Sequence, residues 1–317
     1  MDRLREGAVL VTGFAGRLGR RLVRRLHRTR KVVGLDRKSA RGLPIDVEHE
    51  AFDPQRSGAR QVFRRGDLGA IVHLGVVHDP RAKRSDTHAN NLLAFQRVLE
   101  YAERFEIPKI VVLSSANTYG PRPENAQFLS ESAPLLAGGR FSEMHGLVEL
   151  DLLAQSTFWR LPGTETVILR PANILGTVRN APSNYLRLPV VPTLMGFDPM
   201  VQAVHQDDVV TAIERALAPG VRGIFNVAGP PAVRLSRALE LLGRRTMPVP
   251  YSLAKGGLSG LFLLGMSRFP APELDFIRYV CMVDDGLARR TLGYEPAHDL
   301  RSTLDAVDEE RWVGGAL

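Results

Sequence analysis

The amino-acid sequence predicts an α/β fold, with a doubly wound parallel sheet and a small C-terminal cap region. Short, near-continuously apolar and β-branched runs alternate with longer amphipathic stretches, which is typical of parallel strands covered by helices on both faces. The 317 residues are 44% hydrophobic and 24% charged, so the chain can bury the core of one large domain or two smaller ones. In such a sheet ligands bind at the carboxyl ends of the strands.

Six runs have the composition of strands of the main sheet: Ala8–Thr12, Lys31–Asp36, Ile45–Phe52, Ala70–Leu74, Lys109–Ser114 and Thr166–Arg170. After Pro171 frequent prolines divide the chain into short pieces, which predicts a first domain over residues 1–171 and a mostly substrate-binding cap region over residues 172–317. A helix at Asp207–Ala218 and a strand at Ile224–Val227 are expected to return to the main sheet, so elements near residues 200–227 cross this boundary.

The charge of the chain, +8 with a pI near 10.0, does not predict nucleic-acid binding, because the basic residues are spread along the sequence without an aromatic-basic stripe. The densest run, Arg17 to Arg30, repeats leucine and valine at helical spacing, so its arginines are expected on the solvated face of an amphipathic helix.

The location of the protein is expected to be cytoplasmic, with no membrane partner. Cys281 is the only cysteine, which excludes an intrachain disulfide and a multi-cysteine metal site, and no metal is expected. The N-terminus lacks the regions of a secretory signal. The apolar run Gly256 to Met266 is shorter than the roughly 20 residues that span a bilayer, so we interpret it as a core or pocket-lining helix rather than a membrane-surface segment.

A glycine-rich loop follows the first strand and opens the helix predicted at Arg17–Thr29. Gly13 permits a tight turn, Gly16 lets the backbone approach a pyrophosphate, and Gly19 allows close helix packing. This context predicts a Rossmann-like fold that binds NAD(P)(H). The candidate contacts in the loop are Gly13, Phe14, Ala15, Gly16, Arg17, Leu18 and Gly19.

Asp36 ends the next strand, a little over 20 residues after Gly13, where an acid can bind the adenosine ribose hydroxyls. Its carboxylate favours NAD by repelling the 2′-phosphate of NADP. Arg37 and Lys38 follow at once and can neutralise that phosphate. The choice between NADH and NADPH therefore stays open.

The spacing TGxxGxxG resembles that of the extended short-chain dehydrogenase/reductases, which include the nucleotide-sugar epimerases and dehydratases. Further landmarks of that family appear in order along nearly the whole chain, including His73-Leu74-Gly75 and the segment from Ser114 to Gly120, which matches SSxxxYG. The resemblance implies more cofactor contacts, at Asp53, Leu74, Gly75, Asn91, Ser114, His145, Pro171 and Asn173. It also places Ser115 at the catalytic Ser/Thr position.

The resemblance fails at the family's YxxxK motif, whose tyrosine is the general acid/base and whose lysine binds the nicotinamide ribose. Counted back from Glu149, the Tyr position is Phe141 and the Lys position is His145, one helical turn later on the same face of a predicted helix. Phenylalanine has no proton to give. His145 could bind the ribose, donate a proton or be structural, and Tyr119 is a packing residue or a substitute acid.

Three functions follow from these residues. One is an NAD(P)H-dependent ketoreductase for a bulky aromatic, polyketide-type ketone, whose proton comes from the substrate, from water or from His145; the chain is similar to atypical actinomycete tailoring ketoreductases of this kind. The apolar segments Val190–Phe197 and Leu258–Met266 are candidates for lining the pocket. The alternatives are a nucleotide-sugar epimerase or dehydratase and a non-catalytic NAD(P) sensor or scaffold. The family also implies a homodimer through the helices predicted at Asp86–Phe105 and Phe141–Phe158.

Overall fold

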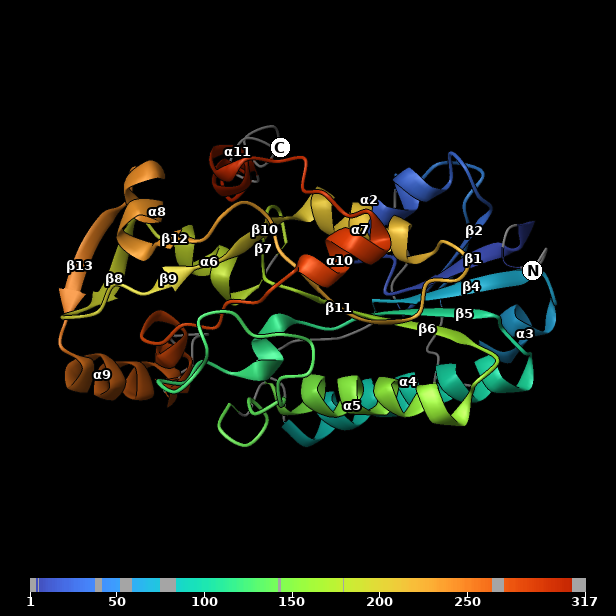
Figure 1. Ribbon diagram of the computed structural model, residues 1–317, viewed down its shortest axis with the longest axis horizontal. Coiled ribbons are helices and arrows are strands. Elements are labelled where there is room, and N and C mark those ends of the chain that lie inside the picture. Colours follow the sequence, from blue (N-terminus) through green and yellow to red (C-terminus); the bar gives the residue numbers. More distant parts are fainter. Residues whose placement is uncertain are drawn as a thin grey trace.

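The computed structural model (Figure 1) is built around one parallel sheet and describes residues 4, 6–37, 42–51, 59–74, 84–141, 144–178, 180–263 and 271–309. The strand order is β11-β6-β5-β4-β1-β2-β3, and each neighbouring pair is parallel. The strands are β1 (Ala8–Thr12), β2 (Val32–Asp36), β3 (Glu48–Ala51), β4 (Leu68–His73), β5 (Lys109–Leu113), β6 (Glu165–Pro171) and β11 (Gly223–Val227). The predicted α/β fold with a Rossmann-like parallel sheet is confirmed.

Helices cover both faces of this sheet (Figure 1). On one face lie α2 (Arg17–Leu26), α7 (Gln206–Ala216) and α10 (Gly286–Leu292), and on the other α3 (Ala59–Arg64), α4 (Arg84–Arg104) and α5 (His145–Arg160). Helix α2 buries Leu22, Val23 and Leu26. Its arginines face outward, and Arg21 and Arg25 form ion pairs with Asp207 and Glu214 of α7. The basic run therefore fastens two helices together on the surface.

A second group of elements forms the part of the molecule that lies beyond the carboxyl ends of the strands. Three two-stranded sheets pair β7 (Asn173–Leu175) with β10 (Ala203–His205), β9 (Met200–Val201) with β12 (Val233–Arg234), and β8 (Val190–Leu194) with β13 (Arg245–Val249). The helical elements are η1 (Ala116–Tyr119), α6 (Ala181–Leu186), α8 (Leu235–Leu241), α9 (Tyr251–Leu263), η2 (Ala271–Ile277) and α11 (Leu300–Asp305). Figure 1 shows β8, β13, α8 and α9 at the end remote from the main sheet.

The third strand and the predicted apolar helix begin at other residues than the sequence predicts. The third strand begins at Glu48 instead of Ile45, because the Val47 amide closes a turn onto the Pro44 carbonyl (3.1 Å) and leaves the Ile45 side chain in solvent. Helix α9 begins earlier than the predicted apolar run, and its first two turns expose Leu253 and Lys255. Across the described residues, none of the helices combines the length and the apolar character needed to cross a bilayer.

Candidate cofactor and substrate site

The backbone of the loop after β1 requires its glycines. Gly13 has a φ of 73°, which L side chains rarely adopt, and the Gly16 amide donates to the Gly13 carbonyl (3.1 Å). A Cβ on Gly19 would lie 2.4 Å from that same carbonyl oxygen and 2.7 Å from the Phe14 Cα. A side chain at Gly19 would therefore prevent α2 from packing this close to the loop after β1.

The N-terminus of α2 opens from this loop as an anion site. Gly16 is the exposed N-cap and has no side chain to cap the helix, and its carbonyl accepts the first helical bond, from the Arg20 amide (2.9 Å). A Cβ on Gly16 would come within 3.2 Å of the Gly13 carbonyl, so the bare backbone leaves room for an approaching phosphate. The residues present therefore fit the pyrophosphate of a dinucleotide.

The side chains of the loop contribute mostly to packing. The Phe14 ring is fully buried and covers Gly34, where a Cβ would lie 2.6 Å from it. Leu18 packs against the same core, and Ala15 and Arg17 are half-buried. Phe14 can therefore contribute only its backbone to a ligand in the loop.

Asp36 lies at the carboxyl end of β2, beside the loop. Its Oδ2 accepts a hydrogen bond from the Ala15 amide (3.1 Å), which holds the carboxylate where the sequence places a ribose contact. Arg37 is exposed next to it. Lys38, Asp53 and Gly75 lie outside the described residues, so these three candidate contacts stay predictions.

The remaining cofactor candidates follow β4, β5 and β6. The Leu74 amide donates to the Thr12 carbonyl (3.1 Å), and Asn91 is buried in α4. Pro171 ends β6 in the core, and Asn173 begins β7, where its Oδ1 accepts from the Asn117 amide group (3.3 Å). Strands β1, β4, β5 and β6 are parallel and end on one edge of the main sheet. The residues that follow β4, β5 and β6 therefore lie on the same side of the molecule as the glycine loop after β1.

His73 is a buried residue at this edge that the sequence reasoning did not select as a site. Its Nδ1 is 2.8 Å from Thr12 Oγ1, its ring lies tilted against that of Phe95 with centroids 4.6 Å apart, and its Nε2 has no hydrogen-bond partner among the described residues. Burial lowers the pKa of His73 to about 4, so the ring is neutral. In the sequence this position is marked only by the family landmark His73-Leu74-Gly75. A sequence motif does not indicate that the histidine is buried.

Ser115 follows β5 and begins the short helix η1. Its Oγ accepts a hydrogen bond from the Asn117 amide (3.1 Å), and the side chain is half-buried. This bond fixes the oxygen and leaves the hydroxyl proton for another acceptor. Ser115 is thus oriented by its own turn.

Phe141, which the family resemblance assigns to the tyrosine position, is a packing residue. It is 3% exposed and belongs to an apolar cluster with Ala137 and Val148. Its ring centroid lies 5.0 Å from that of Phe276 in η2. The phenylalanine side chain therefore joins the segment before α5 to the segment of the chain that ends in η2.

His145 is the first residue of α5, and the predicted helical relation between Phe141 and His145 is wrong. The turn before the helix is closed by the Phe141 amide on the Ala137 carbonyl (2.8 Å), so Phe141 lies outside α5 and shares no helical face with His145. The His145 side chain is 51% exposed, and its Nε2 pairs with Glu149 Oε1 one turn later (3.0 Å).

A buried polar network lies behind Ser115. Arg170 of β6 donates from Nη2 and Nε to the two Asp151 oxygens (2.7 and 2.9 Å), and Ser114 Oγ donates to Asp151 Oδ2 (2.5 Å). Arg170 Nη1 also donates to the Tyr119 hydroxyl (2.9 Å), which donates in turn to Asn226 Oδ1 (2.8 Å).

This network decides the role of Tyr119. Its hydroxyl proton is already given to an amide oxygen, and burial raises the pKa of the phenol. Both effects make Tyr119 a poor proton donor to a substrate. The geometry fits the packing role of the two that the sequence left open.

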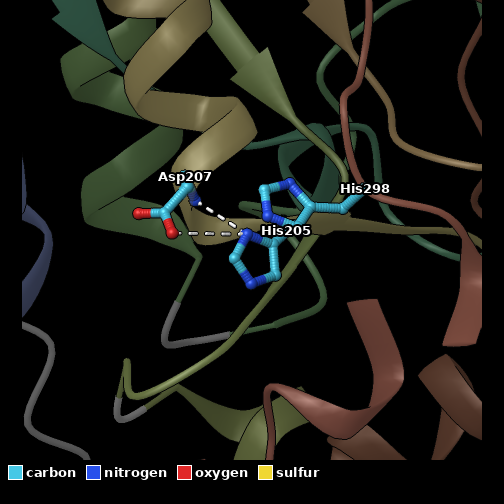
Figure 2. Close-up of side chains that lie close together, drawn as sticks. All are labelled: His205, Asp207 and His298. Atoms are coloured by element: carbon cyan, nitrogen blue, oxygen red, sulfur yellow. Dashed lines mark hydrogen bonds and ion pairs between the residues drawn. The ribbon is translucent and has the colours of Figure 1, made fainter. Parts of the chain in front are cut away.

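A histidine pair ties the C-terminal segment to α7, as Figure 2 shows with His205, Asp207 and His298. The His205 Nδ1 accepts from the Asp207 amide (3.1 Å), and its ring stacks on that of His298 with centroids 3.6 Å apart and planes 21° apart. His298 Nδ1 lies 2.9 Å from Asp208 Oδ1. Possible metal-ligand atoms of His205, Asp207 and His298 lie within 4.8 Å of one another. The two histidine rings are nearly parallel, however, so they cannot both direct a nitrogen lone pair at one ion.

Comparison with known proteins adds a family and several structural neighbours. The profile of the NAD dependent epimerase/dehydratase family matches residues 9–228. An uncharacterized protein of Mycobacterium tuberculosis is 27% identical over 315 residues, which cover 95% of this chain and 82% of that protein. The UDP-glucose 4-epimerase of Thermotoga maritima, solved with UDP-glucose, has a TM-score of 0.75 at 18% identity, covering 96% of this chain and 99% of that chain. The dTDP-glucose 4,6-dehydratase DesIV of Streptomyces venezuelae, solved with NAD, has a TM-score of 0.73 at 22% identity, covering 96% and 98%.

Proposed function

Because the chain belongs to the NAD dependent epimerase/dehydratase family, we propose that it binds NAD(P)(H) and reduces a ketone of a bulky aromatic, polyketide-type substrate without a catalytic tyrosine. One observation carries this proposal. Phe141, which takes the family's tyrosine position, is buried in an apolar cluster and has no proton to transfer. A reaction that needs little from an enzyme acid is therefore favoured.

The cofactor would be held by the loop after β1 and by Asp36. The exposed N-terminal amides of α2 suit its pyrophosphate, and the Asp36 carboxylate, fixed by the Ala15 amide, suits a ribose hydroxyl. When bound, the nicotinamide supplies the hydride for carbonyl reduction. Arg37 is exposed beside Asp36, so either NADH or NADPH fits this end of the site.

The substrate ketone would be oriented by Ser115, whose hydroxyl proton is left for an acceptor such as a carbonyl oxygen. A phenol next to the ketone polarises it internally and can supply the proton, which water or His145 can also do. The chain is similar in this respect to the angucyclinone ketoreductase of simocyclinone biosynthesis, which also departs from the Ser-Tyr-Lys arrangement. This similarity supports a role in tailoring an antibiotic polyketide.

A second candidate function is epimerisation or dehydration of a nucleotide sugar. The solved neighbours favour it, because they are a UDP-glucose 4-epimerase and a dTDP-glucose 4,6-dehydratase. Against it, an epimerase must take and return a proton at an unactivated sugar hydroxyl. The Phe141 ring cannot do so, and the half-exposed His145 is paired with Glu149.

The proposal is tested by mixing the protein with NADH or NADPH and a panel of aromatic ketones that carry a phenol next to the carbonyl, and following the absorbance of the reduced nicotinamide. We expect turnover that persists in Ser115→Ala and His145→Ala with a loss of less than about 100-fold, since single proton-transfer groups contribute about 10²–10⁴-fold where they are needed. Release of a new sugar epimer from UDP-glucose would support the second candidate. Tight cofactor binding without turnover of either substrate would show a sensor or scaffold.

We also propose that two copies associate through α4 and α5. These helices pack on each other and expose Leu93, Leu152 and Trp159, the last of which is 86% exposed. Exposed apolar side chains on two helices that contact each other favour association with another chain. Light scattering on the purified protein would give the mass of the particle directly.

A further inference from the structure

Arg278 follows η2 and is surrounded by aromatic rings. Its guanidinium carbon lies 4.9 Å from the ring centroid of Phe197, 4.3 Å from that of Tyr251 and 4.8 Å from that of Tyr279. The rings come from the loop after β8, from the start of α9 and from the residue next to Arg278. The guanidinium carbon thus lies over the faces of all three rings, at distances typical of cation–π contacts.

The edge of the guanidinium has no acceptor in the described part of the chain. Arg278 Nε is buried without a hydrogen-bond partner, and the residue is half-buried. Other shielded arginines here are paired: Arg170 binds Asp151, and Arg244 binds both oxygens of Asp308 (2.6 and 2.7 Å). A desolvated donor without an acceptor costs free energy unless a partner arrives.

Arg278 lies in a segment of the chain that contacts Phe141 on one side and the residue after Ser115 on the other. Three residues before its neighbour Tyr279, Phe276 packs on Phe141. Three residues after Arg278, Cys281 Sγ lies 3.6 Å from the carbonyl oxygen of Ala116, the residue that follows Ser115. The chain between these two contacts thus passes the site, with Arg278 midway.

We propose that Arg278 binds an oxyanion carried by the substrate, with the surrounding rings as apolar walls for a flat aromatic body. A guanidinium donates two parallel N–H bonds to a carboxylate or phosphate, and its stacked faces leave that edge as its one polar surface. Phe197, Tyr251 and Tyr279 offer a planar ligand stacking partners. This inference rests on the proposed function for its aromatic substrate and adds that the substrate is an anion.

Calorimetric titration tests the assignment without requiring turnover. The probes are rhein, a dihydroxyanthraquinone carboxylate, and aloe-emodin, in which a hydroxymethyl group replaces the carboxylate; UDP-glucose supplies the same oxyanion chemistry as a diphosphate. The full chain is titrated in the presence of NAD or NADP. Variants are Arg278→Gln, Arg278→Lys and the control Arg245→Gln, which removes an exposed arginine of β13.

We expect Arg278→Gln to weaken rhein binding about tenfold or more while aloe-emodin binding changes little, because only rhein loses a charge-assisted bond. Arg278→Lys should retain part of the rhein affinity, and Arg245→Gln all of it. Equal losses for rhein and aloe-emodin would reduce Arg278 to a packing residue and overturn the proposal, as would a loss confined to UDP-glucose.

The outcome is separable from that of the ketone assay. Rhein binding that depends on Arg278 in a protein that reduces no ketone would leave the anion site standing and remove the proposed function. If the protein reduces a ketone but its affinity for rhein does not depend on Arg278, the proposed function stands and the anion site is overturned. Thermal unfolding of Arg278→Gln shows whether its fold is intact, and Arg278→Lys keeps the charge in place if it is not.

Discussion

The loop after β1 and the segment from β5 to α5 lie at the same edge of the sheet, yet they differ in what holds them. In the loop, backbone contacts allow only glycine at Gly13 and Gly19. In the segment, side chains hold the backbone: Phe141 in an apolar cluster, Ser115 on its own turn, and Asp151 with Arg170 behind them. A side-chain site can change its chemistry and keep its fold, whereas a backbone site cannot.

This difference explains the combination of features in the chain. Phe141 packs on Phe276 through its ring alone, a contact that other side chains could replace. Replacing Gly19 would place a Cβ 2.4 Å from the Gly13 carbonyl oxygen. The glycine loop is therefore fixed by steric necessity, while Phe141 makes a hydrophobic contact.

The largest effect is expected from Asp151→Ala, which removes the buried acceptor behind the segment from β5 to α5. Asp151 is fully buried and accepts from Arg170, Ser114 and Gln155. Removing one partner of a buried ion pair leaves an uncompensated charge, so the free energy of unfolding should fall by about 3–5 kcal/mol. Urea denaturation measures it. The exposed acid Asp305, paired with Arg301, is the control: Asp305→Ala should cost less than about 1 kcal/mol. A similar cost at both positions would contradict this account.

Gly19→Ala should distort the glycine loop after β1. The added Cβ meets the Gly13 carbonyl and the Phe14 Cα, which are backbone atoms and cannot rotate away. Overpacking of this kind costs about 1–3 kcal/mol, and the displaced loop should lose most of its affinity for NADH and NADPH. Fluorescence titration of both cofactors measures this. Gly163→Ala adds a Cβ that meets nothing within 4 Å and should leave affinity unchanged.

These two regions also differ in how far the sequence reveals them. The predicted strand Ala8–Thr12 agrees with β1, and Gly13 and Gly19 have the conformations that their spacing indicates, because local sterics decide both. The start of α5 was placed too early, since the Phe141 contact with Phe276 joins residues far apart in sequence. No local pattern carries such a contact.

Other features depend on the same long-range packing. Arg278 is separated in sequence from Phe197, and the absence of an acceptor for its Nε among the described residues is a property of the folded chain. The stack of His205 on His298 likewise joins α7 to the C-terminal segment. Periodicity and motif spacing predict which elements form and in what order, but they do not indicate which side chains meet between elements.

Acid should destabilise the protein through His73, which is buried at the end of β4 and contacts Thr12, the residue before Gly13. Burial lowers the pKa of His73 from 6.5 to about 4, so the unfolded chain takes up the proton first, and the free energy of unfolding falls as the pH drops from about 6.5 towards 4. His205, whose pKa burial and His298 also lower to about 4, adds in the same direction. Each should remove about 2 kcal/mol between about pH 7 and about pH 5. In denaturation at both pH values, His73→Asn should lose only the contribution of His205, about half of the loss of the unaltered protein. A pH dependence equal to that of the unaltered protein would show that His73 takes no part.

The smallest effect on activity should come from adding a hydroxyl at Phe141, which tests whether the position that the family resemblance assigns to the tyrosine faces a substrate. Phe141→Tyr places an O–H in a cluster formed by Ala137, Val148, Leu135, Met144 and Phe276, where the described side chains offer apolar contacts. An unsatisfied hydroxyl costs about 1–3 kcal/mol, so the free energy of unfolding should fall slightly, and kcat for ketone reduction should stay the same. Phe128, which is 48% exposed, is the matched control: Phe128→Tyr should change neither quantity.

The double variant Phe141→Tyr with His145→Lys carries the argument further, because it rebuilds the residue types of the family's motif. Since Phe141 lies in the turn before α5 and His145 begins the helix, a lysine there would not be one helical turn from the new phenol. The ammonium therefore should not lower the phenol pKa, and the pH profile of kcat should gain no new ionisation. A rise in kcat with a new ionisation would mean that the segment moves onto a helical path when ligands bind, and that the difference between the two regions belongs to the free protein alone.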